Sequence, residues 1–298
     1  MKKIAPLFLV LSLVVVSGCV EFEDLGVDGV GLLGLGEPEY TVPEEISVNV
    51  DPVPTEVSSG RSLDVFFDVM NTGNTTLENV MLEKVDMCIF EEEDIENLDG
   101  VELRSGDGRT VMWSFNAPEV DMDRSCHMKY RAYYDSTANA VFNVRALDED
   151  EYNLRQRAGD LDQLSDVRYE KTKTPAEIMV EVSEEQPMME GDDFLVHFHI
   201  ENKGDGFVDG DSIKEDGILL DFDDDLLEFR GCQGRNSTQG HEGEIRFDET
   251  DFRNGQTIKT SCRFFIEEGI GTSETGTFKM DVNYTYVKDG SFQVDLVP

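Results

Sequence analysis

The feature that most limits the fold of this chain is an alternation of apolar and polar residues that occurs twice, 131 residues apart. Apolar residues occupy every second position of 63–69 before Asn71-Thr72-Gly73, and of 194–200 before Asn202-Lys203-Gly204. A glycine, Gly60 or Gly191, precedes each run at the same spacing. Period-two alternation that ends in an Asn/Gly turn is typical of half-buried β-strands. The sequence therefore predicts an all-β fold built from two related units.

More strands are expected around these runs. Ile46, Val48 and Val50 alternate in the same way and recur as Ile178, Val180 and Val182, and further strands are expected at 77–89, 109–116, 127–134 and 140–146. We expect 130–144 and 284–294 to be hairpins with a turn between two alternating runs. Short strands at even spacing predict two β-sandwiches, 45–147 and 175–298, each of ordinary domain size. Residues 148–174 would connect them through a short helix or an irregular segment.

The first nineteen residues carry targeting signals. Lys2 and Lys3 precede an apolar run, 4–16, which is too short to span a bilayer but fits a signal peptide. The sequence Val16-Ser17-Gly18-Cys19 resembles the lipobox of secreted lipoproteins. That resemblance implies cleavage after residue 18 and lipid on Cys19. Residues 19–44 are rich in Gly and acidic residues without a sustained period, so we expect a tether there. An ordinary signal peptide that contains a Cys, or an uncleaved anchor, is the alternative.

Acidic residues dominate the charge of the chain. The sequence has 64 Asp and Glu against 25 Lys and Arg, a net charge of −39. This excludes nucleic acid as a natural partner, because phosphate binding needs patches of Lys and Arg. Like charges also destabilise a compact chain unless salt screens them. The diffuse acidic excess therefore predicts a very salty medium such as a halophilic archaeal envelope, with a merely acidic surface protein as the alternative.

Cysteine usage fits secretion. Apart from Cys19 there are four cysteines, which allow three pairings. A domain boundary between 126 and 232 favours Cys88–Cys126 and Cys232–Cys262, in an oxidising compartment. Neither pair has the CxxC spacing of a zinc or redox site.

Two segments resemble a known family. Residues 65–74, Val-Phe-Phe-Asp-Val-Met-Asn-Thr-Gly-Asn, together with Gly60, resemble the CARDB-type and related immunoglobulin-like domains of prokaryotic surface proteins, and 196–204 resemble a second copy. The resemblance implies two tandem immunoglobulin-like β-sandwiches in an envelope or adhesion protein. It provides no catalytic residues. The acidic stretch 205–225 departs from a minimal domain of this kind.

Metal sites are suggested by two groups of residues. Clustered carboxylates are suitable ligands for Ca²⁺, and they occur at Asp205, Asp209, Asp211, Asp223, Asp224 and Asp225. Their spacing fails the EF-hand pattern, and acidic runs are expected in so acidic a chain without any site. His197 and His199 share one face of a predicted strand and could hold a metal. Because Val196, Phe198 and Ile200 would take the inward face, we expect an exposed pair, and the metal role is the alternative.

Other single residues have simpler interpretations. Asn74, Asn236 and Asn283 begin N-x-[ST] sequons and are glycosylation candidates, with Asn74 in a predicted turn and Asn283 in a predicted strand. Trp113 is expected in the core of the first sandwich.

The expected function is binding rather than catalysis. The chain has no GxSxG, HExxH or P-loop sequence, and its cysteines are assigned to lipid or disulfides, so we expect no enzyme and no cofactor. We expect a lipoprotein on the extracellular face of the cytoplasmic membrane that binds or adheres to an extracellular protein or glycan. A structural spacer is the main alternative, and a divalent-metal-dependent surface enzyme is a remote one.

Overall fold

The computed structural model describes residues 44–164, 168–233, 237–239 and 243–298. Residues 41–298 form one compact unit. This unit is nearly all-β and consists of packed antiparallel sheets, which confirms the predicted fold class. Among the described residues, no helix has the length and apolar composition needed to cross a membrane. The signal peptide, Cys19 and Asn236 lie outside the described residues.

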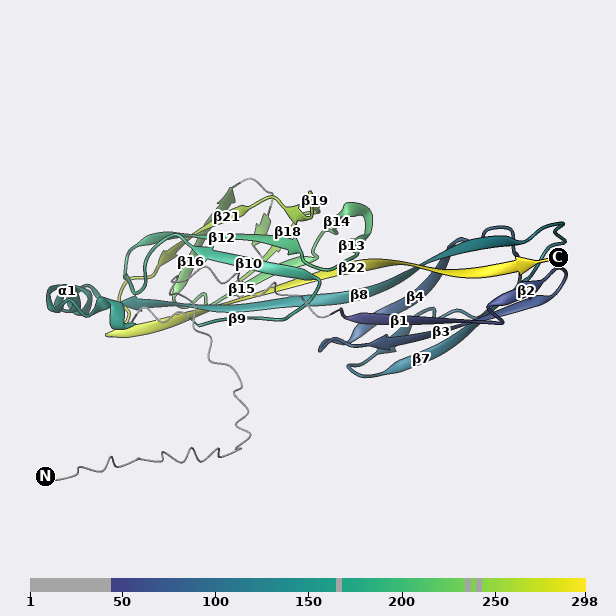
Figure 1. Cartoon of the computed structure of the whole chain (residues 1–298). Coiled ribbons are helices and arrows are strands. Elements are labelled where there is room, and N and C mark those ends of the chain that lie inside the picture. Colours follow the sequence, from purple (N-terminus) through teal and green to yellow (C-terminus); the bar gives the residue numbers. More distant parts are fainter. Residues whose placement is uncertain (1–43, 165–167, 234–236, 240–242) are drawn as a thin grey trace, which may run out of the picture. The chain divides into compact units, whose positions relative to one another are not determined.

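Three sheets make up the unit (Figure 1). The four-stranded sheet has the order β1 (Ile46–Val53), β3 (Ser62–Asn71), β7 (Gly108–Asn116), β5 (Glu91–Ile95). The seven-stranded sheet has the order β14 (Ser212–Ile213), β19 (Thr250–Arg253), β20 (Gln256–Thr257), β12 (Asp193–Asn202), β21 (Thr260–Ile266), β16 (Leu227–Gln233), with β10 (Ala176–Val182) beside β12.

The largest sheet has eleven strands. Its order is β17 (Ser237–Gln239), β18 (Glu244–Phe247), β15 (Ile218–Phe222), β22 (Ser273–Val297), β8 (Arg124–Leu147), β4 (Leu77–Asp86), β6 (Val101–Leu103). Four short strands join it at the side: β2 (Glu56–Ser58), β9 (Tyr169–Lys171), β11 (Met188–Met189) and β13 (Phe207–Val208). The helical elements are α1 (Glu149–Ala158), η1 (Leu161–Leu164) and η2 (Asp209–Asp211).

Strands β8 and β22 pair without interruption over nearly their whole length. Their antiparallel register runs from Leu147 opposite Ser273 to Arg124 opposite Leu296, and Figure 1 shows the teal and yellow strands side by side. The predicted hairpins at 130–144 and 284–294 are therefore wrong. The polar residues 135–139, which suggested a turn, stay extended because β8 continues to hydrogen-bond β22 there. At Gly290, the missing side chain leaves room for the ring of Tyr130, which would lie 2.1 Å from a Cβ there.

The buried apolar residues form one cluster, which packs against alternate residues of these two strands. Near one end Phe67 of β3 meets Tyr130 of β8, with ring centroids 5.2 Å apart. Near the other end Phe264 of β21 meets Phe278 of β22 at 4.9 Å. The last residues of β22 pair with β2, so the end of the chain completes the first sandwich. The domain boundaries drawn around 148–174 stay a prediction, but strand pairing crosses them.

The internal repeat is visible in the two Asn-x-Gly turns. Asn71 donates from Nδ2 to the Thr75 carbonyl at 2.7 Å and accepts from the Gly73 amide at 2.9 Å. Asn202 makes the same two bonds, to the Gly206 carbonyl at 2.7 Å and from the Gly204 amide at 3.1 Å. Polar Asn side chains thus close both turns by local hydrogen bonds.

The register corrects one detail of the predicted repeat. Val48 lies opposite Val69, and Ile178 lies opposite Ile200, the counterpart of Val69. Ile178 therefore corresponds to Val48 and not to Ile46. A two-residue shift keeps every side chain on the same face, which is why alternation alone did not detect it.

Three further predictions are confirmed. Cys88 pairs with Cys126, and Cys232 pairs with Cys262. Trp113 is fully buried and packs on Phe67 with ring centroids 4.3 Å apart. The connector contains the short helix α1, which begins after the N-cap Asp148 and ends at Gly159 in the left-handed conformation.

Candidate functional site

A groove of about 530 Å³ opens over the middle of the eleven-stranded sheet. Its floor is the middle of β8 and β22, where Asp135–Thr137 pair with Asn283–Thr285. One wall is Thr76 and Glu78 at the start of β4, and the other is formed by the segment 209–217 between β13 and β15. Its volume lies within the usual range for ligand sites.

The wall at 209–217 is held by backbone geometry. The Gly217 amide donates to the Lys214 carbonyl at 2.9 Å, and the Asn283 amide of β22 donates to the Gly217 carbonyl at 2.7 Å. Asp216 takes a left-handed φ of 59°, which Asp tolerates better than most residues. A Cβ at Gly217 would lie 2.6 Å from Cγ2 of Ile213, so only glycine allows this close turn.

Carboxylates and hydroxyls converge in the groove. It is lined by five carboxylates and one ammonium group, that of Lys214. Asp135 is fixed, because Thr285 Oγ1 donates to one of its oxygens at 2.5 Å and Asn79 Nδ2 to the other at 2.7 Å.

Three other groove carboxylates, those of Glu78, Asp209 and Glu215, make no hydrogen bond or ion pair with any described residue. A groove with this charge and these acceptors can bind an uncharged polyhydroxylated group or a cationic one, and it repels anions.

The structure does not bring the six predicted calcium ligands together. Asp209 lines the groove, whereas Asp205 pairs with Lys288 at 3.3 Å. Asp223 lies far from the groove, because its amide donates to the carbonyl of Thr277. Thr277 is six residues along β22 from Asn283 on the groove floor, a distance of about 20 Å. Asp211, Asp224 and Asp225 are exposed. No group of three potential metal ligands occurs within the described ranges, and calcium stays a prediction.

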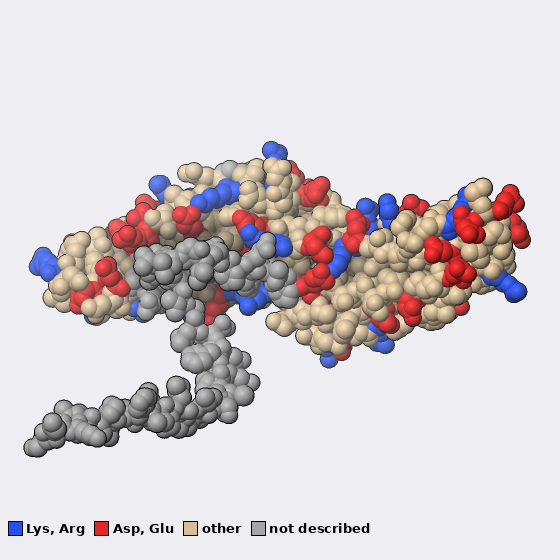
Figure 2. All heavy atoms as spheres, viewed as in Figure 1, with Lys and Arg blue, Asp and Glu red and all other residues tan. Residues whose placement is uncertain are grey.

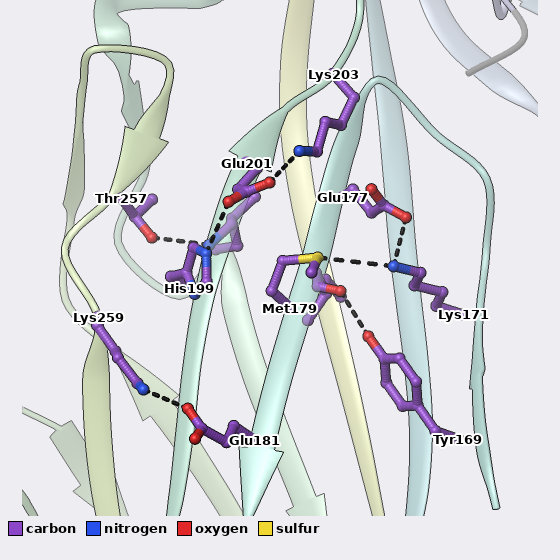
Figure 3. Close-up of polar contacts among 12 residues, drawn as sticks. Tyr169, Lys171, Glu177, Met179, Glu181, His199, Glu201, Lys203, Thr257 and Lys259 are labelled. Atoms are coloured by element: carbon purple, nitrogen blue, oxygen red, sulfur yellow. Dashed lines mark hydrogen bonds and ion pairs between the residues drawn. The ribbon is translucent and has the colours of Figure 1, made fainter. Parts of the chain in front are cut away.

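His199 of β12 lies beside a ladder of ion pairs (Figure 3). His197, two residues earlier, is on the same face of the strand, and both side chains are half-buried. His199 Nε2 lies 3.0 Å from Glu201 Oε1, and Glu201 also binds Lys203. The Lys203 ammonium holds the pKa of Glu201 below its usual range. Lys259 does the same to the pKa of Glu181. The two histidines are thus used in polar contacts on a sheet face.

His197 also contacts a serine, which raises the question of catalysis. Its Nδ1 lies 2.7 Å from Ser261 Oγ, an arrangement that can activate a nucleophile. Catalysis also needs a group that orients the imidazole and a cavity for substrate. No hydrogen bond from the His197 ring to a carboxylate is found among the described residues, and neither His197 nor Ser261 lines the groove.

Two of the three predicted sequons can be placed. Asn74 is exposed in the first Asn-x-Gly turn. Asn283 is exposed on the groove floor, where its Oδ1 accepts from Thr137 Oγ1 at 2.7 Å. Use of either site for glycosylation stays a prediction.

Sequence reasoning missed most of the groove. Asp135, Ser136 and Thr137 suggested a turn, and their small polar side chains give no local sign that the strand continues. Thr76 precedes an ordinary strand, and Glu78 is its second residue. Of the predicted site residues only Asp209 and Asn283 line the groove. The signal that could have found it is the uninterrupted alternation across 126–146.

Comparisons with known proteins do not identify the chain. No protein-family model matches it, and no curated protein matches it. Among solved structures, the secreted serine protease VesC from Vibrio cholerae aligns with 75% of this chain at 10% identity and a TM-score of 0.20. The alignment covers only 47% of that protease.

Two other solved structures are equally distant. The yeast delta-COP-I mu-homology domain in complex with a Dsl1 peptide aligns with 77% of this chain, at 79% coverage of its own length, 9% identity and a TM-score of 0.20. The collagen adhesin CNA from S. aureus aligns with 84%, at 92% of its own length, 8% identity and a TM-score of 0.13. Similarities this weak carry no argument about function.

Proposed function

We propose that this chain is a non-enzymatic, lipid-anchored extracellular protein that binds a glycan or protein surface through the groove above β8 and β22. Lipid on Cys19 would attach it to the outer face of the cytoplasmic membrane, and the tether 19–44 would present the described unit. The immunoglobulin-like character of the sandwiches belongs to the same proposal. It rests on the resemblance of 65–74 and 196–204 to surface-protein domains.

The observation that carries the binding proposal is the groove itself. Three carboxylates without partners among the described residues, together with the hydroxyls of Ser136, Thr137 and Ser212, line a concavity of about 530 Å³. Its floor lies on two central strands and is therefore rigid. A rigid concave site with convergent polar groups is the usual form of a binding site.

The charge distribution supports a salty environment. Figure 2 shows Asp and Glu side chains scattered over the visible face with Lys and Arg among them. Many of the cations are already paired with neighbouring carboxylates, for example Arg131 with Asp289 at 2.8 Å and Arg246 with Glu244 at 2.6 Å. The remaining acidic excess needs screening by salt for a compact fold. We therefore include a halophilic, archaeal-type envelope in the proposal.

A spacer is the second candidate, and one observation favours it. The pair β8–β22 runs unbroken over 24 residues of β8. At about 3.3 Å per residue such a strand is about 80 Å long, which suits a part that holds something away from a membrane.

Binding can be tested on an array of neutral, anionic and amino-sugar glycans, probed with the full chain in high salt. We expect signal from neutral or amino-sugar glycans and none from anionic ones. The double variant Glu78→Lys with Glu215→Lys reverses two groove charges and should reduce the signal at least tenfold.

The matched control is Asp51→Lys with Glu56→Lys, which makes the same charge change at exposed positions of β1 and β2. The control should keep the signal. If the array gives no signal, or if both double variants bind like the wild type, the groove is not the binding site and the spacer is favoured.

A further inference from the structure

The four-stranded sheet has one face packed into the core and another face that is open. In β3 and β7, buried residues alternate with residues that are half-buried or exposed. The buried set includes Phe67 and Trp113 and forms the inner face. At the outward positions of β1, β3 and β7 no residue is buried, so no described element covers this outer face.

An apolar pair lies at the centre of the outer face. Phe66 of β3 is directly opposite Met112 of β7, and both residues are half-buried. Met70, four residues further along β3, is 46% exposed. Because alternate residues of a strand share a face, Met70 lies on the same side of the sheet as Phe66. Exposed apolar side chains with a polar rim are typical of an interaction surface.

Two fixed carboxylates stand on either side of this apolar pair. Asp64 and Asp68 are two residues before and two residues after Phe66 on β3. Ser114 Oγ donates to Asp64 Oδ1 at 2.7 Å, and Thr110 Oγ1 donates to Asp68 Oδ1 at 2.5 Å. The outer face therefore presents a negative, an apolar and a negative group in a line along β3, about 7 Å apart.

These carboxylates have no cation beside them. The contacts of Asp64 and Asp68 within the described chain are the two hydroxyl bonds, and neither is an ion pair. Strands β1 and β3 contain no Lys or Arg, and Arg109 of β7 is in phase with the buried Val111. The edge strand β5 is acidic at four of its five positions. The outer face is thus uniformly negative around its apolar centre.

The internal repeat provides a comparison. At the displacement of 131 residues, β3 corresponds to β12 of the seven-stranded sheet. There the chain supplies its own cations, since Glu201 pairs with Lys203 and Glu181 pairs with Lys259 (Figure 3). Adaptation to salt acts on both sheets alike and does not explain why only one of them is neutralised. A partner that brings the missing cations does explain it.

We propose that the outer face of the four-stranded sheet docks a basic segment of a partner protein, which presents Lys or Arg on both sides of an apolar side chain. The apolar side chain covers Phe66 and Met112, and the two cations meet Asp64 and Asp68. A second copy of this chain does not fit, because two such faces would bring carboxylates against carboxylates. The face shares no residue with the groove, so the inference does not depend on the function proposed above.

Binding of labelled peptides to the full chain in detergent tests this face, with fluorescence anisotropy as the measurement. The probe is the peptide Thr-Lys-Thr-Leu-Thr-Lys-Thr, whose Lys and Leu side chains share one side when it is extended. We expect it to bind, the peptide with Glu for Lys not to bind, and the peptide with Ser for Leu to bind at least about fivefold more weakly. Binding should weaken as salt rises from about 0.2 M to about 1 M, with circular dichroism as the check on folding.

Isosteric variants locate the binding. Asp64→Asn with Asp68→Asn removes both charges, keeps an oxygen for each hydroxyl donor, and should weaken binding of the Lys–Leu peptide at least about threefold. The matched control, Glu184→Gln with Glu185→Gln, removes the same charge at exposed positions after β10 and should leave binding unchanged.

Methyl NMR of the methionine-labelled protein gives a second readout. The signals of Met70 and Met112, assigned through Leu substitutions, should shift with the Lys–Leu peptide and not with the Glu peptide. If the three peptides behave alike, or if Asp64→Asn with Asp68→Asn binds the Lys–Leu peptide like the wild type, the outer face is no docking surface and the proposal is wrong.

Discussion

Gly206 is expected to tolerate no side chain, because the turn that contains it presses against β22. A Cβ at this position would lie 2.1 Å from the carbonyl oxygen of Val287 and 2.8 Å from Cε1 of Tyr286. Gly206 is not among the residues with positive φ, so conformational freedom is not the reason for glycine here. The close approach of two backbones is the reason.

The size of the effect follows from what must move. An ordinary contact needs at least 3.4 Å, so the turn would have to shift by about 1 Å. That shift breaks the 2.7 Å bond from Asn202 Nδ2 to the Gly206 carbonyl and the 2.9 Å bond from the Gly206 amide to Tyr286 Oη. At about 1–3 kcal/mol for each of the two broken bonds, Gly206→Ala should lower the free energy of unfolding by about 2–6 kcal/mol.

Urea unfolding at fixed salt measures this change, followed both by far-UV circular dichroism and by the fluorescence of Trp113. Trp113 lies in the core of the first sandwich. Because β8 and β22 pair over nearly their whole length, its transition should move with that of the whole unit.

The control is Gly271→Ala. A Cβ there would meet only Glu274 Oε1, at 3.6 Å, so its effect should stay within about 0.5 kcal/mol. An unchanged urea midpoint for Gly206→Ala would refute the argument from close approach.

The other predictions concern one buried tyrosine, one disulfide and the expected lipid-attachment site. Tyr169 donates to the Ile178 carbonyl at 2.7 Å, so Tyr169→Phe should cost about 1 kcal/mol at neutral pH. Burial raises the pKa of Tyr169 from 10.0 to about 12, so wild-type stability should fall as pH rises through this range, and urea midpoints should fall less in the variant. Replacing Cys232 and Cys262 by Ser opens a loop with a sequence separation of 30 and should cost about 3–4 kcal/mol, measured by unfolding without reductant. Cys19→Ser should move the protein from the membrane fraction to the medium, and continued membrane retention would argue against a lipid anchor.

Much of the fold could be predicted from the sequence because its signals are local. Alternation at 63–69 and 194–200 places one side of each strand in the core, as the buried Val65 and Val196 show. Each Asn side chain closes its turn with bonds to residues two and four positions away. The cysteine pairs lie within their predicted units.

The burial of single carboxylates and the candidate groove could not be predicted in the same way. Glu44 is exposed and Glu45 is buried, yet they are adjacent and chemically identical. What separates them is contact with Ser136, 91 residues away. The groove likewise joins β4 to the segment 209–217, and no periodicity links segments so far apart.

The sequence alone determined that the chain is all-β, where most strands and turns lie, and which cysteines pair, since each depends on patterns within a strand, a turn or one unit. Only the tertiary structure decided that β8 and β22 continue as one unbroken pair past the polar stretch 135–139. Whether a strand ends at a polar stretch depends on whether a partner strand is there to hydrogen-bond it, and that partner comes from the other end of the chain.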